Sequence, residues 1–167
     1  NYHPFAEIKS LRSRKDLLRM GRDMSIFMQG KLRGQRVLLK DPFALFSTPW
    51  FAQKLNCQVV ITVRHPAAFA SSLKRLNWPF DFSNLLGQPI LMHDHLEADR
   101  ADMQSIQPAD IIGQAALLWR MIYRFVHSTS NLFPQFHIVR HEDLSIDPVA
   151  GYQSLYTSLG LNFDEKV

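Results

Sequence analysis

The sequence is poor in cysteine, in glycine loops and in long apolar runs, and each shortage excludes a class of protein. Cys57 is the one cysteine in 167 residues, which excludes an intrachain disulfide framework and is compatible with a reducing compartment such as the cytoplasm. No apolar run approaches the roughly 20 residues of a membrane-spanning helix, so no transmembrane segment is expected. The early glycines, Gly21, Gly30 and Gly34, lack the spacing of a phosphate-binding loop.

A strong excess of one charge is also missing. The chain has 19 Lys and Arg against 15 Asp and Glu, a net charge of +4, which suits an anionic ligand. Outside residues 9–22 the basic residues are scattered, and no nucleic-acid-binding motif accompanies them, so no nucleic acid partner is expected. Hydrophobic residues make up 46%, enough for the core of one domain, and we expect a single domain over residues 1–167.

What the sequence has is an alternation of short apolar runs and amphipathic stretches, which predicts an α/β domain with a parallel sheet. Strands are expected at Val37–Leu39, Val59–Val63 and Phe136–Val139. Helices are expected at Ser13–Met28, Phe43–Leu55, Ala67–Leu76, Ile111–Leu132 (with Asp110 as N-cap) and Val149–Leu159. Residues 77–110 are expected to be irregular, with one short helix within 82–91, and to border an acceptor pocket.

The most informative stretch runs from Val59 to Phe80. Its strand ends at Arg64, and Pro66 restarts the backbone as a helix, so Arg64 lies where free helix amides favour anions. Ser72, eight residues on, places a hydroxyl donor within that helix. This order predicts a phosphate site. The alternative is an arginine that caps the sheet edge through a surface ion pair, and the spacing alone does not separate the two.

Arg-His-Pro followed by this serine resembles the 3′-phosphate-binding element of sulfotransferases that use 3′-phosphoadenosine 5′-phosphosulfate (PAPS). A bacterial branch of that family is similar to four blocks in the same order: LLKDPFALFSTPWFA, VVITVRHPAAFASSLKRLNWPFDF, DIIGQAALLWRMIYR and IVRHEDLSIDP. The resemblance implies a three-layer, P-loop-like fold. It also implies transfer of a sulfuryl group from PAPS, without a metal, to a hydroxyl acceptor such as a carbohydrate or lipid headgroup.

The resemblance also implies site residues. Arg64 and Ser72 would bind the 3′-phosphate, and Lys40, after the expected strand VLL, would contact the transferring sulfuryl group. His141 stands where many relatives have a tyrosine near the adenine.

The catalytic base is not assigned by the resemblance. Many members have a histidine two residues after the lysine, but Pro42 stands there in this chain. Asp41 is the candidate base because it adjoins Lys40.

The loop that binds the 5′-phosphosulfate in the family, rich in Gly, Ser and Thr, has no counterpart between Asn1 and Gly34. We therefore expect the chain to be an internal piece of a longer sulfotransferase and to be inactive by itself, with further strands elsewhere. Two alternatives stay open: a nucleotide or sugar kinase-like P-loop protein, which needs a Walker-type lysine loop upstream, and a non-catalytic α/β nucleotide-binding module.

Three further groups of residues receive plain structural interpretations. The triplet 93–95, His-Asp-His, is interpreted as exposed polarity, and no metal is assigned to it. Trp119 and Tyr123 share the apolar stripe of a helix and are expected in the core. Glu142 and Asp143 are adjacent after a strand, which favours a turn or cap over paired catalysis.

Overall fold

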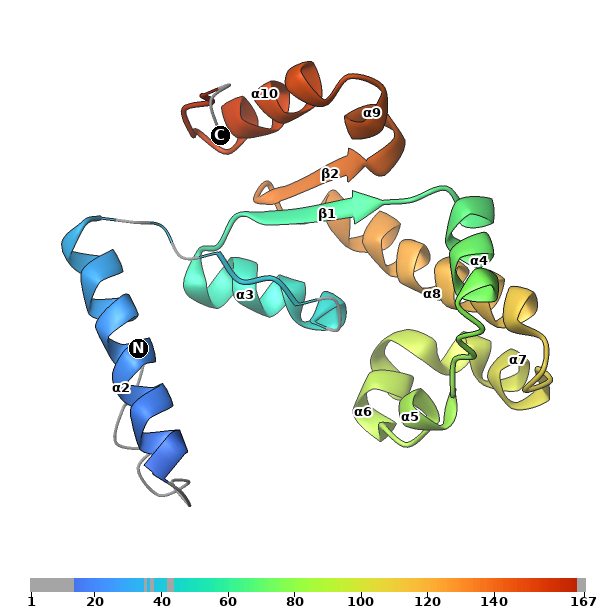
Figure 1. The fold of residues 1–167 in the computed structure, drawn as a ribbon. Helices are drawn as coiled ribbons and strands as arrows, with labels where there is room; N and C mark the ends of the chain where they lie inside the picture. Colours follow the sequence, from blue (N-terminus) through green and yellow to red (C-terminus); the bar gives the residue numbers. More distant parts are fainter. Residues whose placement is uncertain (1–13, 35, 37, 42–43, 165–167) are drawn as a thin grey trace. The chain divides into compact units, whose positions relative to one another are not determined.

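A computed structural model describes residues 14–34, 36, 38–41 and 44–164. The chain separates into two compact units, residues 1–41 and residues 42–167 (Figure 1). This division does not test the expectation of a single domain, which stays a prediction.

The first unit contains the helix α2 (Arg14–Leu32), close to the range expected from the sequence. Asp16 in its first turn and Lys31 in its last turn complement the helix dipole. Gly34 follows with a φ of 64°, the left-handed conformation that commonly ends a helix and that glycine adopts without strain.

The strand expected at Val37–Leu39 is not found at those of its residues that the structure describes. Leu38 and Leu39 lie outside regular structure and are 90% and 65% exposed, whereas Val37 lies outside the described residues. The prediction rested on an apolar run. Such a run forms a strand only when a neighbouring strand pairs with its backbone, and the described sheet consists of two other strands.

The second unit mixes helices with a parallel sheet. Its elements in chain order are η1 (Leu45–Ser47), α3 (Thr48–Leu55), β1 (Val59–Val63), α4 (Pro66–Arg75), α5 (Ser83–Leu86), α6 (Pro89–Leu91), η2 (Met92–Leu96), η3 (Glu97–Asp99), α7 (Arg100–Ser105), α8 (Ile111–Ser130), β2 (Phe136–Arg140), α9 (His141–Ile146) and α10 (Pro148–Ser158). The elements η1 and η3 are 3₁₀ helices, and η2 is a short π-helix. The expected strands at β1 and β2 and the expected helices at α4, α8 and α10 are confirmed to within about two residues.

The two strands run parallel and in register, from the pair Val59 and Phe136 to the pair Val63 and Arg140. Because the strands are parallel and pair one to one along their whole length, both end at the same edge of the sheet. The chain between them includes α8, which begins where the Asp110 side chain accepts a hydrogen bond from the Gly113 amide at 2.8 Å, the expected N-cap. Helices α8 and α10 both contact β2 and lie on opposite sides of the strands in Figure 1.

Residues 77–110 are mostly helical, which corrects the expectation of an irregular segment. The pieces α5, α6, η2, η3 and α7 follow one another with few residues between them. Each piece spans six residues or fewer, too short to show a helical period in the sequence. Burial stabilises them, because their apolar side chains form the core with α8: Phe82, Met92, Leu96, Met103, Leu117 and Met121.

A buried carboxylate ties this segment to α8. The Asp99 side chain is 2% exposed, and it accepts hydrogen bonds from the guanidinium groups of Arg120 and Arg124. A carboxylate loses its hydration when it is buried, so it is stable here because two cations and several N–H donors replace the water.

Candidate anion site at the ends of the strands

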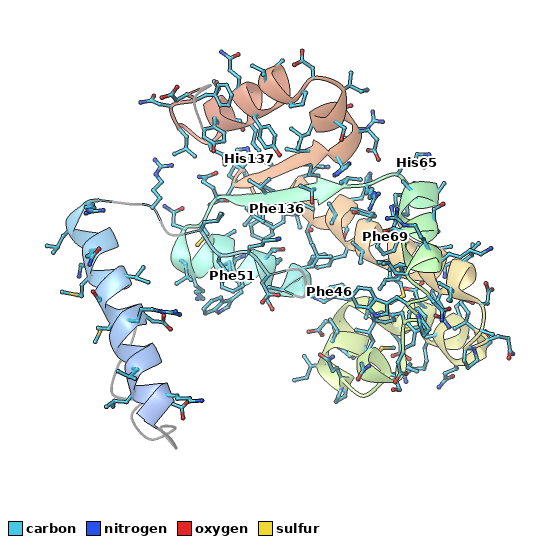
Figure 2. The ribbon with its side chains drawn as sticks, viewed as in Figure 1. Phe46, Phe51, His65, Phe69, Phe136 and His137 are labelled. Atoms are coloured by element: carbon cyan, nitrogen blue, oxygen red, sulfur yellow. The ribbon has the colours of Figure 1, made fainter. Side chains whose placement is uncertain are left out.

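The candidate site is built on the corner where β1 turns into α4. Val63 ends the strand and Pro66 begins the helix, so Arg64 and His65 form the connection (Figure 2). The His65 imidazole Nδ1 accepts a hydrogen bond from the Ala67 amide at 3.2 Å and thereby caps the helix. Proline suits the first helical position because its missing N–H needs no partner there.

Two side chains of α8 bind the backbone of Arg64. The Trp119 indole Nε1 donates to the Arg64 carbonyl oxygen at 2.7 Å. The Tyr123 hydroxyl accepts from the Arg64 amide at 3.4 Å and donates to the Thr62 carbonyl at 3.2 Å. The two rings lie against each other with centroids 4.6 Å apart.

These contacts refine the expectation that Trp119 and Tyr123 belong to the core. Both side chains are half-buried, and their polar ends reach the corner rather than the core cluster. Burial raises the pKa of Tyr123, although the hydrogen bond from the Arg64 amide acts in the opposite direction. The phenol therefore keeps its proton at neutral pH and can donate it to the Thr62 carbonyl.

A third contact joins the ends of the two strands. The His65 amide donates to the Glu142 carboxylate at 2.8 Å, and Glu142 lies in the first turn of α9, directly after β2. This hydrogen bond is the main reason why the pKa of Glu142 is lowered. The sequence suggested a local turn or cap role for Glu142. In the structure its carboxylate also binds the His65 amide, 77 residues away in the sequence.

The backbone of Arg64 is hydrogen-bonded. Its guanidinium, in contrast, has no hydrogen bond or ion pair among the residues that the structure describes. The Ser72 hydroxyl likewise has no partner within that part of the chain. Both residues are half-buried. The ion pair that the sequence left open as an alternative for Arg64 is therefore not formed within the described ranges.

Ser72 lies in the second turn of α4, six residues after Pro66. A helix rises by about 1.5 Å per residue, which places Ser72 roughly 9 Å along the axis from the corner. That Arg64 and Ser72 grip one phosphate stays a prediction.

His141 lies at the same edge of the sheet as Arg64, because β1 and β2 end in register. It is the first residue of α9 and is exposed, with Nδ1 within 3.4 Å of the Ser145 hydroxyl. Its contact with an adenine stays a prediction.

Lys40 and Asp41 belong to the first unit. Both are exposed and lie outside regular structure. Their catalytic roles stay predictions.

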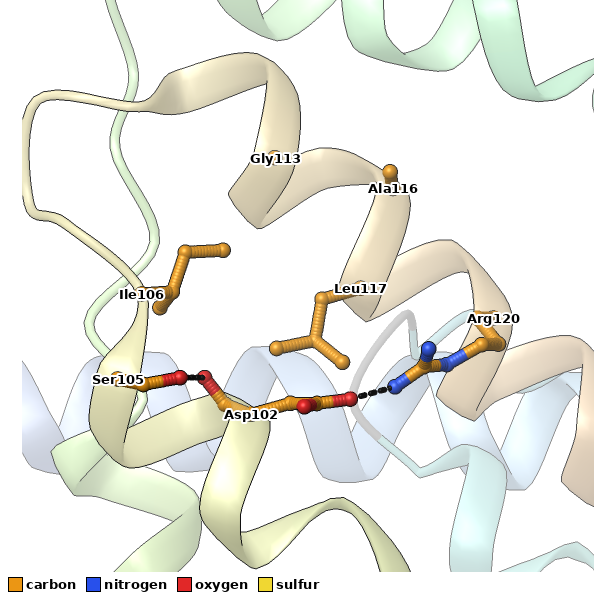
Figure 3. A pocket seen from close by; sticks show the side chains of 7 residues that line it. All are labelled: Asp102, Ser105, Ile106, Gly113, Ala116, Leu117 and Arg120. Atoms are coloured by element: carbon orange, nitrogen blue, oxygen red, sulfur yellow. Dashed lines mark hydrogen bonds and ion pairs between the residues drawn. The ribbon is translucent and has the colours of Figure 1, made fainter.

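A separate hollow of about 370 Å³ lies between α7 and α8 (Figure 3). Ile106 and Leu117 line it, and the Arg120 guanidinium crosses one end to the Asp102 carboxylate. The Ser105 hydroxyl donates to the Asp102 carbonyl at 3.2 Å. Because these polar groups already have partners, we assign no ligand to the hollow.

The triplet 93–95 lies in the π-helix rather than in a loop. The His93 side chain is 88% exposed, and its Nδ1 lies 2.8 Å from the Asp94 carboxylate, which raises the pKa of His93. Within the described ranges, no three His, Cys, Asp or Glu side chains gather in a way that would hold a metal ion. Nor does any helix in those ranges have the length and apolar character to cross a membrane.

Comparison of the chain with protein-family models, with curated proteins and with solved structures found no match.

Proposed function

We propose that the chain binds PAPS through its 3′-phosphate and takes part in transferring the sulfuryl group to a hydroxyl acceptor, such as a carbohydrate or a lipid headgroup. One observation carries the proposal. Arg64 has a backbone bound by two side chains of α8 and a guanidinium without a partner among the described residues, at the carboxyl edge of a parallel sheet. In α/β proteins that edge is where ligands bind.

The chemistry of this corner suits a phosphate dianion. A guanidinium presents several N–H donors in a planar fork, and such charge-assisted bonds are about twice as strong as neutral ones. The N-terminus of α4 adds the positive end of a ten-residue helix dipole. The Ser72 hydroxyl supplies a neutral donor on the same helix.

The remaining roles follow from the resemblance. The reaction needs a base that takes the proton of the acceptor hydroxyl, and cations that stabilise charge on the transferring group and on the leaving phosphate. We assign the cation role to Lys40 and the base to Asp41, and we place His141 beside the adenine. The proposal includes a three-layer, P-loop-like domain in which further strands extend the sheet.

The test is calorimetric titration of the chain with 3′-phosphoadenosine 5′-phosphate and with adenosine 5′-phosphate, which lacks the 3′-phosphate. We expect the first nucleotide to bind more tightly by about 2–4 kcal/mol, or roughly 30- to 1,000-fold, because it alone engages Arg64. Equal affinities would overturn the proposal.

Activity is tested with protein expressed from the complete gene. Transfer of labelled sulfate from PAPS to sugars, phenols or glycolipids is expected. Transfer of a phosphoryl group from ATP to the same acceptors, with no transfer from PAPS, would instead support a kinase.

A further inference from the structure

One carbonyl group at the corner accepts its hydrogen bond from a distant side chain. The Arg64 carbonyl lies between the end of β1 and the start of α4, and Trp119 supplies the hydrogen bond that it accepts. Two nearby amides cannot replace this donor: Pro66 has no N–H, and the Ala67 amide donates to the His65 imidazole. The donor to this carbonyl is therefore a side chain 55 residues away in the sequence.

The Tyr123 hydroxyl fixes the other side of the same residue. It accepts from the Arg64 amide and donates to the Thr62 carbonyl, so it bridges two peptide groups where the strand ends. Trp119 and Tyr123 are four residues apart on α8, and this spacing puts both on one face of the helix. One rigid helix thus holds both the amide and the carbonyl of Arg64.

We infer that Trp119 and Tyr123 are positioning residues, which fix the Arg64 backbone so that its guanidinium is preorganised for the 3′-phosphate. The inference rests on the proposed function of Arg64. Without these two contacts the corner gains conformational freedom, and phosphate binding must then remove that freedom at a cost in affinity. The cost falls only on ligands that use Arg64.

The experiment compares Trp119→Phe and Tyr123→Phe with the wild-type 167-residue chain. Each variant keeps an aromatic ring and removes one polar group, the indole N–H or the phenol O–H. Matched controls are Trp78→Phe and Tyr152→Phe, whose aromatic side chains are exposed and lie outside the corner. Affinities for 3′-phosphoadenosine 5′-phosphate and for adenosine 5′-phosphate are measured by calorimetry, and urea unfolding monitors folding.

Trp119→Phe is expected to lower the affinity for 3′-phosphoadenosine 5′-phosphate by about five- to tenfold, the equivalent of one lost hydrogen bond. Tyr123→Phe is expected to lower the same affinity by about threefold. Binding of adenosine 5′-phosphate is expected to change by less than about twofold, as are both affinities in the two controls. A purely structural role would reduce both affinities by the same factor.

Equal losses for the two nucleotides in both variants, or no loss for either, would overturn the inference while the wild-type preference for the 3′-phosphate stands. Equal binding of the two nucleotides by the wild-type chain is a different result, which would overturn the proposed function and the inference with it. If Trp119→Phe fails to fold, Tyr123→Phe decides the question, because it leaves the ring packing of α8 unchanged.

Discussion

Each strand of the sheet runs into the same tripeptide, Val-Arg-His, at residues 63–65 and 139–141, yet the side-chain contacts at the two corners differ. At the first corner other elements bind the backbone: α8 holds Arg64, and α9 holds the His65 amide. At the second corner the described side-chain contacts of Arg140 and His141 are local. The Arg140 guanidinium lies 3.9 Å from Asp143, three residues on.

This difference teaches that the tripeptide itself does not make a site. The two tripeptides are also offset by one residue in the sheet, because Val63 pairs with Arg140 rather than with Val139. Arg140 therefore ends its strand, whereas Arg64 lies beyond the end of β1 and is half-buried. Arg64 thus has a backbone held by α8 and a guanidinium without a partner among the described residues, whereas the exposed Arg140 has a local carboxylate nearby.

The largest expected difference between the corners concerns nucleotide affinity. Arg64→Ala is expected to weaken the binding of 3′-phosphoadenosine 5′-phosphate by about 2–4 kcal/mol, because a charge-assisted phosphate contact is lost. The binding of adenosine 5′-phosphate is expected to change little. Arg140→Ala is expected to change the binding free energy of either nucleotide by less than about 0.5 kcal/mol, as for the loss of a surface ion pair. Calorimetry on both variants measures this, and similar losses for the two arginines would remove the distinction between the corners.

The two histidines should differ in stability. His65→Ala removes the imidazole that accepts the Ala67 amide and caps α4, and a lost cap costs about 1 kcal/mol of unfolding free energy. His141→Ala removes an exposed imidazole that caps no helix and is expected to cost less than about 0.5 kcal/mol. Urea unfolding compares the two variants. A larger loss for His141→Ala would contradict the assignment of the cap.

A smaller effect concerns Glu142, which links the corners and whose pKa is lowered from its ordinary value of 4.5 by the His65 amide. A lowered folded-state pKa means that the carboxylate stabilises the fold above pH 4.5 and loses this contribution as the pH falls through the folded-state value. Wild type should therefore exceed Glu142→Gln in stability at pH 6, and the difference should shrink toward pH 3. A difference that stays constant over that range would rule out this linkage.

The smallest effect is expected at Asp143. Its carboxylate and the Arg140 guanidinium are 59% and 66% exposed, so water and salt screen their attraction. Asp143→Asn should change the unfolding free energy by less than about 0.5 kcal/mol, within the usual range for exposed pairs. A urea titration with a larger loss would show that the second corner is more tightly held than its contacts indicate.

The corners also show what the sequence could predict. The elements β1, α4 and β2 were predicted because apolar runs end at charged residues and because Pro66 marks a helix start. The hydrogen bonds that the side chains of Trp119, Tyr123 and Glu142 make with the first corner were not, because they join residues 55 to 77 positions apart. The available signal was the polar atom that Trp and Tyr each carry on an otherwise apolar helix face, since such an atom needs a partner when it is buried.

The two wrong expectations have related causes. Leu38 and Leu39 form an apolar run, but a strand depends on a partner strand that local sequence does not specify. Residues 77–110 contain Pro79, Pro89 and Pro108 and show little periodicity, yet packing against α8 stabilises their short helices. In both cases tertiary contacts decided the structure: their lack left the first segment without a strand, and their presence made the second segment helical.

The buried carboxylate of Asp99 has a consequence for the motions of the second unit. Because Asp99 accepts hydrogen bonds from two arginines of α8, opening the turns around η3 and α7 breaks these contacts together with the packing of the core. Hydrogen exchange should therefore find the amides of α7 opening together with the middle of α8, as one cooperative unit. A segment that reads as a loop in the sequence would then exchange as slowly as the helix to which it is bound.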